Sequence, residues 1–148
     1  MTIMKTTNPG RKPVAGFTLL EVLIAVLVLS VGLLGLAGLQ ATGMKTNHSA
    51  YMRSQAVAYG YDILDRMRAN RLSALSGTYN IAMGASAAGG TSIAQTDVRE
   101  WKALIAGHLP RGDASANVNG GIATVVVQWD DSRADGNSTE NITIQTEL

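Results

Sequence analysis

The chain has 148 residues, with 12 basic and 11 acidic side chains and a formal net charge of +1 at pH 7. This near balance leaves no basic patch of the kind that binds nucleic acid, so nucleic acid is not an expected partner. The absence of cysteine excludes disulfides and thiolate metal sites.

Residues 1–16 are predicted to form a leader peptide. The segment is polar and has no acidic side chain, but it carries three basic ones, Lys5, Arg11 and Lys12. Basic residues ahead of a membrane helix keep that end in the cytoplasm. The rest of the chain is therefore expected on the far side of the membrane.

An uncharged apolar run of 23 residues, Val22 to Met44, follows the leader. As a helix it would span roughly 34 Å at 1.5 Å per residue, enough for the roughly 30 Å core of a bilayer. Glu21 is the one charge at its start. Since a carboxylate in hydrocarbon costs at least about 2.5 kcal/mol, Glu21 is expected to be functional and to have a partner.

Together, the basic leader, the Gly16-Phe17 junction, the sequence Thr-Leu-Leu-Glu ending at Glu21 and the apolar run resemble the class III signal of type IV pilins and type II secretion pseudopilins. In that family a prepilin peptidase cuts after the glycine and methylates the new N-terminal amine. The resemblance implies cleavage after Gly16, N-methylation of Phe17, and pairing of Glu21 with the N-terminal amine of a neighbouring subunit. Such pairing would offset part of the cost of both charges in lipid.

Two other interpretations of the N-terminal segment stay open. The first is a plain signal anchor whose glutamate lies near the lipid headgroups. The second is an ordinary secretory signal cleaved at the small-x-small triplet 35–37. Within the run, Gly32, Gly35 and Gly38 recur every third residue. They could let the helix loosen during assembly, or they could be ordinary membrane-helix glycines.

Residues 45–71 are predicted to continue the helix as an amphipathic segment. The first apolar row consists of Ala50, Val57, Tyr61 and Leu64, and the second of Met52, Ala56, Tyr59, Ile63 and Met67. One row is expected to pack on the chain's own head and the other to remain for a neighbouring subunit, unless the head buries both. Asp62 and Arg66 have the spacing of a solvent-exposed helical ion pair, worth about 0.3–0.5 kcal/mol.

The remaining residues predict a small head. Residues 72–96 are uncharged and rich in Gly, Ser and Ala, which is typical of a loop. A short helix is expected over Asp97–Leu109, capped by Asp97 with Glu100 and anchored in the core by Trp101. Strands are expected over 114–118, 122–129 and 141–147, the first two joined by a turn at Asn119-Gly120-Gly121.

The predicted fold is therefore α+β, a long N-terminal helix packed against a small antiparallel sheet with one short extra helix. Its parts are a cleaved leader (1–16), a transmembrane and assembly helix (17–44), an amphipathic continuation (45–71) and a periplasmic head (72–148).

No catalytic, cofactor or metal site is expected. Asp130, Asp131 and the segment 135–137 place acidic and amide oxygens in one loop, but Arg133 occupies a position that a calcium loop needs for a ligand. A solvated hairpin loop is the other interpretation. His48 and His108 have no nearby ligand-type residue in the sequence, and no nucleotide-binding or hydrolase motif is present. An enzyme is therefore not expected.

Residues 49–51, 53–56, 61–71 and 125–133 resemble the PilV branch of minor pilins. The lack of cysteine departs from the disulfide-closed loop of many major pilins. The resemblance implies a single-pass inner-membrane protein that joins other minor pilins and the major pilin in priming or capping pilus assembly. Two alternatives are a minor pseudopilin of type II secretion and, from a different class, a bitopic membrane enzyme or ligand-binding protein.

Overall fold

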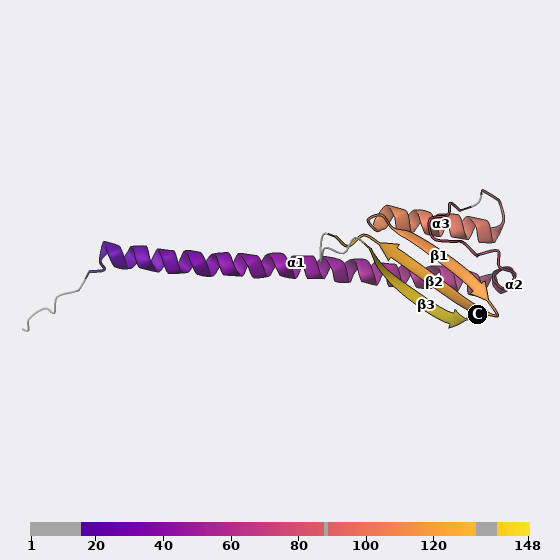
Figure 1. The fold of residues 1–148 in the computed structure, drawn as a ribbon, viewed down its shortest axis with the longest axis horizontal. Helices are drawn as coiled ribbons and strands as arrows, with labels where there is room; N and C mark the ends of the chain where they lie inside the picture. The colour runs from indigo at the N-terminus through magenta and orange to yellow at the C-terminus, as the bar shows by residue number, and fades with distance from the viewer. Residues whose placement is uncertain (1–15, 88, 133–138) are drawn as a thin grey trace, which may run out of the picture. The chain divides into compact units, whose positions relative to one another are not determined.

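A computed structural model of the protein describes residues 16–87, 89–132 and 139–148. The chain divides into two units, Met1–Gln40 and Ala41–Leu148, which are described separately. The elements are α1 (Leu19–Ala69), α2 (Arg71–Leu75), α3 (Ile93–His108), β1 (Asp113–Asn119), β2 (Ile122–Trp129) and β3 (Glu140–Glu147) (Figure 1). This is the predicted α+β fold.

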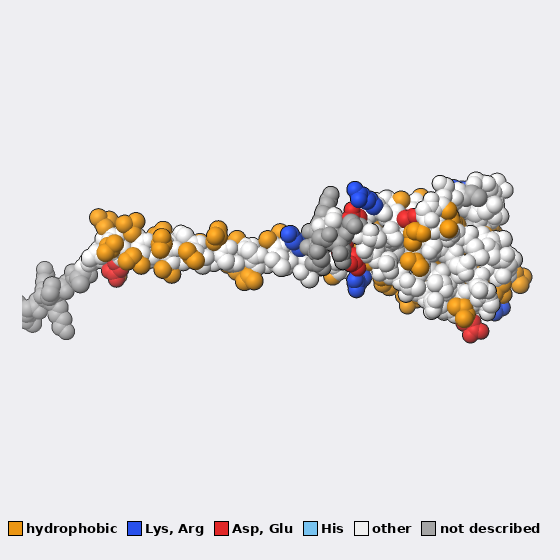
Figure 2. Space-filling model, in the orientation of Figure 1, with side chains coloured by type: hydrophobic (Ala, Val, Ile, Leu, Met, Phe, Trp, Pro, Cys, Tyr) orange, Lys and Arg blue, Asp and Glu red, His pale blue; other side chains and the backbone are white. Residues whose placement is uncertain are grey.

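The first unit contains the beginning of α1, whose side chains are exposed throughout. Figure 2 shows apolar side chains distributed along this part of the helix. The residues that the structure describes contain one helix, α1, that is long and apolar enough to cross a membrane. A soluble monomer rarely exposes so extended an apolar surface, because each apolar group in water costs free energy. The segment therefore suits a lipid environment.

In the second unit, the later part of α1 packs on the head through the second predicted row. The core includes Met52, Ala56, Ile63 and Met67, and Tyr59 packs partly buried against it. In the first row Val57 and Tyr61 remain 36% and 51% exposed, whereas Leu64 is fully buried. The prediction that one row is buried and the other stays open is thus confirmed, with Leu64 as the exception.

The sheet is antiparallel, with the strands in the order β1-β2-β3. Val125 lies opposite Ala116 on one side and Ile144 on the other, and alternate residues along β1 and β2 are buried. Gly120 and Gly121 have φ values of 57° and 84°, which is the left-handed conformation that a two-residue hairpin turn requires. The three strands and the turn at Asn119-Gly120-Gly121 agree with the sequence prediction.

Trp101 anchors the head core as predicted. Its side chain is fully buried, and its Nε1 donates a hydrogen bond of 2.8 Å to the carbonyl oxygen of Tyr59. One residue further along α1, Gly60 lies so close to β3 that a Cβ there would be 2.6 Å from Cδ1 of Ile144. The absence of a side chain at Gly60 therefore lets α1 and the sheet approach closely.

The predicted start of the third helix was wrong. The helix begins at Ile93, and its cap is Ser92, whose hydroxyl accepts a hydrogen bond from the N–H of Gln95 in a reciprocal capping box. Asp97 lies inside the helix instead of capping it. The Ser-x-x-Gln spacing is itself a capping-box pattern, and it occurs five residues before the Asp-x-x-Glu pattern on which the prediction rested.

The segment 72–96 is also more ordered than predicted. It contains the end of α2, the beginning of α3 and a two-way backbone hydrogen bond between Ile81 and Ala116 of β1 (2.8 and 3.0 Å). The oxygens considered for calcium at 135–137 lie outside the described residues. Asp131 is only 2% exposed and accepts a hydrogen bond from the hydroxyl of Ser49.

We expect Gly60→Leu to lower the free energy of unfolding of the head by about 1–3 kcal/mol, the usual cost of overpacking. Ala58→Leu, at an exposed position of the same helix, is the control and should change it by less than about 0.5 kcal/mol. Thermal unfolding of the detergent-solubilised full chain measures both. Equal stability of the two variants would contradict the close packing at Gly60.

Candidate functional site

The residues before α1 form the accessible part of the candidate processing site. Gly16, Phe17 and Thr18 precede the helix and have no regular secondary structure. The Phe17 side chain is 84% exposed, and the position of a Cβ on Gly16 has no neighbouring atom within 4 Å. Accessible, non-helical backbone is what a peptidase requires of its substrate.

Glu21 lies in the first turn of α1, which gives it a local role that sequence reasoning missed. Its N–H donates to the hydroxyl of Thr18 (3.2 Å), so Thr18 caps the helix. The Thr-x-x-Glu spacing is that of a capping box, and this was the available signal. A carboxylate in this turn typically gains about 0.3–1 kcal/mol from the helix dipole. That gain is smaller than the cost of at least about 2.5 kcal/mol for a charge in hydrocarbon, so the need for a further partner remains.

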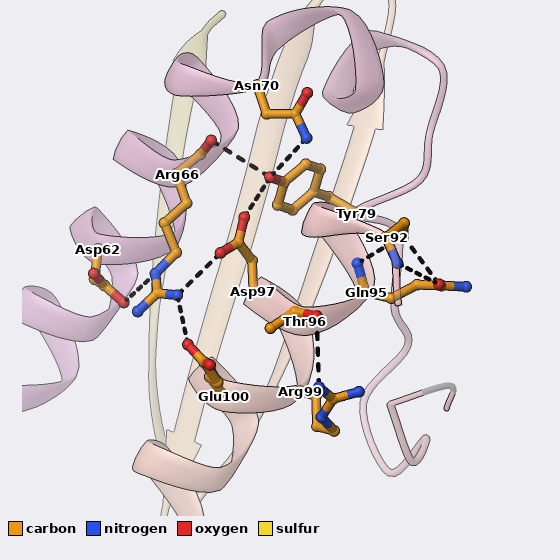
Figure 3. A network of polar contacts seen from close by, with 10 residues as sticks. All are labelled: Asp62, Arg66, Asn70, Tyr79, Ser92, Gln95, Thr96, Asp97, Arg99 and Glu100. Atoms are coloured by element: carbon orange, nitrogen blue, oxygen red, sulfur yellow. Dashed lines mark hydrogen bonds and ion pairs between the residues drawn. The ribbon is translucent and has the colours of Figure 1, made fainter. Parts of the chain in front are cut away.

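In the head, Arg66 is the centre of a charged network between α1 and α3 (Figure 3). Its Nε donates to Asp62 (3.1 Å), and its Nη1 donates to Asp97 (3.1 Å) and Glu100 (3.2 Å). The predicted ion pair between Asp62 and Arg66 is confirmed, but it is less exposed than expected, because the side chain of Arg66 is only 27% exposed. Burial alone would lower the pKa of Arg66, but the hydrogen bonds to the three carboxylates raise it above its usual range.

Tyr79 joins the same network from the segment before α3. Its hydroxyl donates to Asp97 (2.6 Å) and accepts from Nδ2 of Asn70 (3.3 Å) (Figure 3). Burial of the ring, and then the hydrogen bond to Asp97, raise the pKa of Tyr79 to about 12. A tyrosine that stays protonated beside an arginine paired with three carboxylates suits a structural role better than proton transfer at neutral pH.

A second ion pair fixes the segment that leads to α3. Nζ of Lys102 lies 2.8 Å from Oδ1 of Asp113 and also donates to the carbonyl oxygen of Ala85, while the N–H of Gly84 donates to Oδ2 of Asp113. Burial would raise the pKa of Asp113, but these bonds, led by the one from Lys102, lower it below its usual value.

One cavity of the head, of about 460 Å³, is lined in part by Arg99, Lys102 and Asp113. A cavity of about 300 Å³ lies between the segment 78–86 and α3, and its lining side chains are uncharged. His48 and His108 are both exposed, and Nδ1 of His108 contacts the carbonyl oxygen of Leu104 (2.8 Å). Within 16–87, 89–132 and 139–148, no group of three or more His, Asp or Glu side chains could hold a metal ion.

We expect Arg66→Met to lower the free energy of unfolding by about 1–3 kcal/mol, because it leaves three carboxylates without their shared cation at a half-buried site. Arg68→Met is the matched control, because Arg68 pairs with Asp65 at an exposed position (2.7 Å). This substitution should lower the free energy of unfolding by less than about 1 kcal/mol. Urea unfolding of both variants provides the comparison. A larger loss in Arg68→Met would contradict the role assigned to the network.

The N-terminal segment matches a known family model. Residues 11–37 match the model described as the prokaryotic N-terminal methylation motif, and this range includes Gly16, Phe17 and Glu21. No curated protein and no solved structure matches the chain at a significant level. Together with the apolar helix and the α+β head, the methylation motif supports a type IV pilin-like family for this chain.

Proposed function

We propose that the chain is a minor pilin of the PilV kind that takes part in priming or capping the assembly of type IV pili. The observation that carries the proposal is the methylation motif at 11–37. From Leu19 onward it lies on a helix whose first part is apolar and exposed and whose second part is built into a small head. Proteins with this motif are structural and non-enzymatic in kind, so the chemistry at Gly16 and Phe17 is performed on the chain by a prepilin peptidase.

In this proposal cleavage after Gly16 creates a methylated ammonium on Phe17. The ammonium of one subunit then pairs with Glu21 of its neighbour, because each charge alone is costly in lipid. The pairing fixes the axial register between neighbouring helices. It also explains why an otherwise uncharged segment carries one carboxylate.

The head then supplies the choice of partners. The subunit is held in the inner membrane by α1 with its head in the periplasm, where the head meets other minor pilins and the major pilin. The open row of α1, with Val57 and Tyr61, is available for such a contact. Neither residue is charged, so burial of apolar area can drive the association.

We expect the mature protein to begin at Phe17 with a methylated amine, as measured by mass spectrometry of the intact protein. We also expect Glu21→Gln to be cleaved normally but to lose co-purification with other pilins. Glutamine is accepted at the third position of a capping box, so this variant removes the charge while keeping the start of the helix.

Glu21→Ala serves as the comparison for that variant. If glutamine restored the assembly that alanine loses, Glu21 would act through the helix cap and not through its charge. A mature N-terminus at Gly38 would overturn the proposal in favour of a secretory signal. Full assembly by both variants would instead favour the bitopic enzyme or ligand-binding protein.

The main alternative, a minor pseudopilin of type II secretion, carries the same kind of N-terminal signal. We expect deletion of the encoding gene to abolish surface pili and twitching motility while protein secretion continues. Electron microscopy of sheared pili and assays of secreted proteins measure the two outcomes. Loss of secretion with intact pili would establish the alternative.

A further inference from the structure

The outer edge of β3 is an unpaired sheet edge. The N–H of Leu148 donates to Gly121 in the turn before β2 (3.0 Å), and N–H groups alternate in direction along an antiparallel strand. The N–H and C=O groups of Asn141, Thr143, Gln145 and Glu147 therefore point away from β2. All four residues are exposed. In the part of the chain that the structure describes, no other backbone group bonds to their N–H and C=O groups, and the carbonyl oxygen of Glu147 accepts one side-chain hydrogen bond, from the adjacent Thr146 (3.3 Å).

The opposite edge of the sheet is satisfied within the chain. By the same alternation, Ala114, Ala116 and Val118 of β1 point outward. Ala116 exchanges two backbone hydrogen bonds with Ile81, and the N–H of Val118 donates to the side chain of Asn80 (2.8 Å). The N–H of Ala114 donates to the carboxylate of Asp113 (2.8 Å). Among the described residues, the β1 edge is thus covered and the β3 edge is open.

An uncovered part of α1 lies beside the open edge. Side chains of α1 donate hydrogen bonds to β3 near both ends of the strand, from Arg53 to Glu140 (3.3 Å) and from Arg68 to Thr146 (3.2 Å). Between these two arginines, on the same side of the helix, Val57 and Tyr61 remain exposed. A further strand would lie about 4.8 Å beyond β3, where its inward side chains could cover both residues.

The chemistry of the edge selects an extended peptide as the occupant. Between Glu140 and Glu147 the strand has no charge and no proline, and it is rich in β-branched residues (Ile142, Thr143, Ile144 and Thr146). Exposed edges usually carry a central lysine, a proline or a bulge that prevents strand addition, and this one has none of them. Glu140 contacts Arg53, but the described residues place no ion-pair partner near Glu147. An incoming basic side chain would complement that charge.

We propose that the β3 edge accepts a strand from the head of another pilin subunit, which becomes the fourth strand of the sheet. The occupant is an extended segment with alternating apolar residues that cover Val57 and Tyr61, and with a lysine or arginine opposite Glu147. Main-chain hydrogen bonds to the four outward residues supply the pairing, and the alternating side chains supply the specificity. The inference rests on the proposed function, since it requires another pilin head as neighbour.

Thr143→Pro tests the proposal, because proline removes an outward N–H that the fold does not use and is tolerated on edge strands. The full-length variant is co-expressed with the other pilins of the same assembly system. We expect its unfolding temperature and N-terminal processing to be unchanged and its recovery of the partner pilin to fall at least tenfold. Thr143→Ala keeps the N–H and is the matched control, which should recover the partner normally.

Amide hydrogen exchange on the unmodified complex gives a second measurement that needs no variant. Exchange at Thr143 and Gln145 should slow at least tenfold when the partner pilin is bound, whereas Ala116, already paired within the chain, should not change. Unchanged exchange at both residues would overturn strand addition, even where Thr143→Pro proves unstable. Pairing between two differently tagged copies of this chain would overturn the assignment to another pilin.

These outcomes are distinct from failure of the proposed function. If the chain is processed at Phe17 and joins pili without protection of the β3 edge, only the strand addition is wrong. If Phe17 is never the mature N-terminus, the proposed function itself is wrong.

Discussion

Burial of one face of α1 under the sheet is the interaction on which the head depends. A three-stranded sheet with one apolar face must bury that face against another element. Here the helix supplies the missing layer, through Met52, Ala56, Ile63 and Met67. α3 adds Trp101 to the same core, and the indole N–H of Trp101 donates a hydrogen bond to the carbonyl oxygen of Tyr59 in α1. The helix is therefore the largest structural element of the head as well as a continuation of the apolar segment.

This arrangement assigns different requirements to successive parts of one helix. Before Lys45 the sequence needs apolar side chains on every face and tolerates glycine. After Lys45 it needs one face shaped to the sheet and one face free. Gly60 shows how strict the second requirement is, because Ile144 occupies the space that a side chain there would need. At Gly32, Gly35 and Gly38, in contrast, a Cβ would have open space around it.

Local signals in the sequence were sufficient for the strands, the hairpin and the long helix. The turn at Asn119-Gly120-Gly121 was predictable because two consecutive glycines suit the left-handed conformation, and the neighbouring strands alternate clearly. The start of α3 was not predictable in the same way. Two capping patterns lie five residues apart, and no local signal shows that Asp97 is used instead for an ion pair with Arg66 of α1. The open edge of β3 depends on strand order, which no local pattern determines.

The cap formed by Thr18 has a consequence for processing. Scission after Gly16 would leave Thr18 in place, so the helix start need not refold when the leader departs. The new ammonium would then lie just ahead of the positive end of the helix, where its own backbone dipoles repel it and attract the carboxylate of Glu21. Within one subunit, the helix terminus would itself compete with that ammonium for Glu21. Maturation would therefore place a positive charge beside the positive end of the helix. A second helix placed alongside would offset this repulsion.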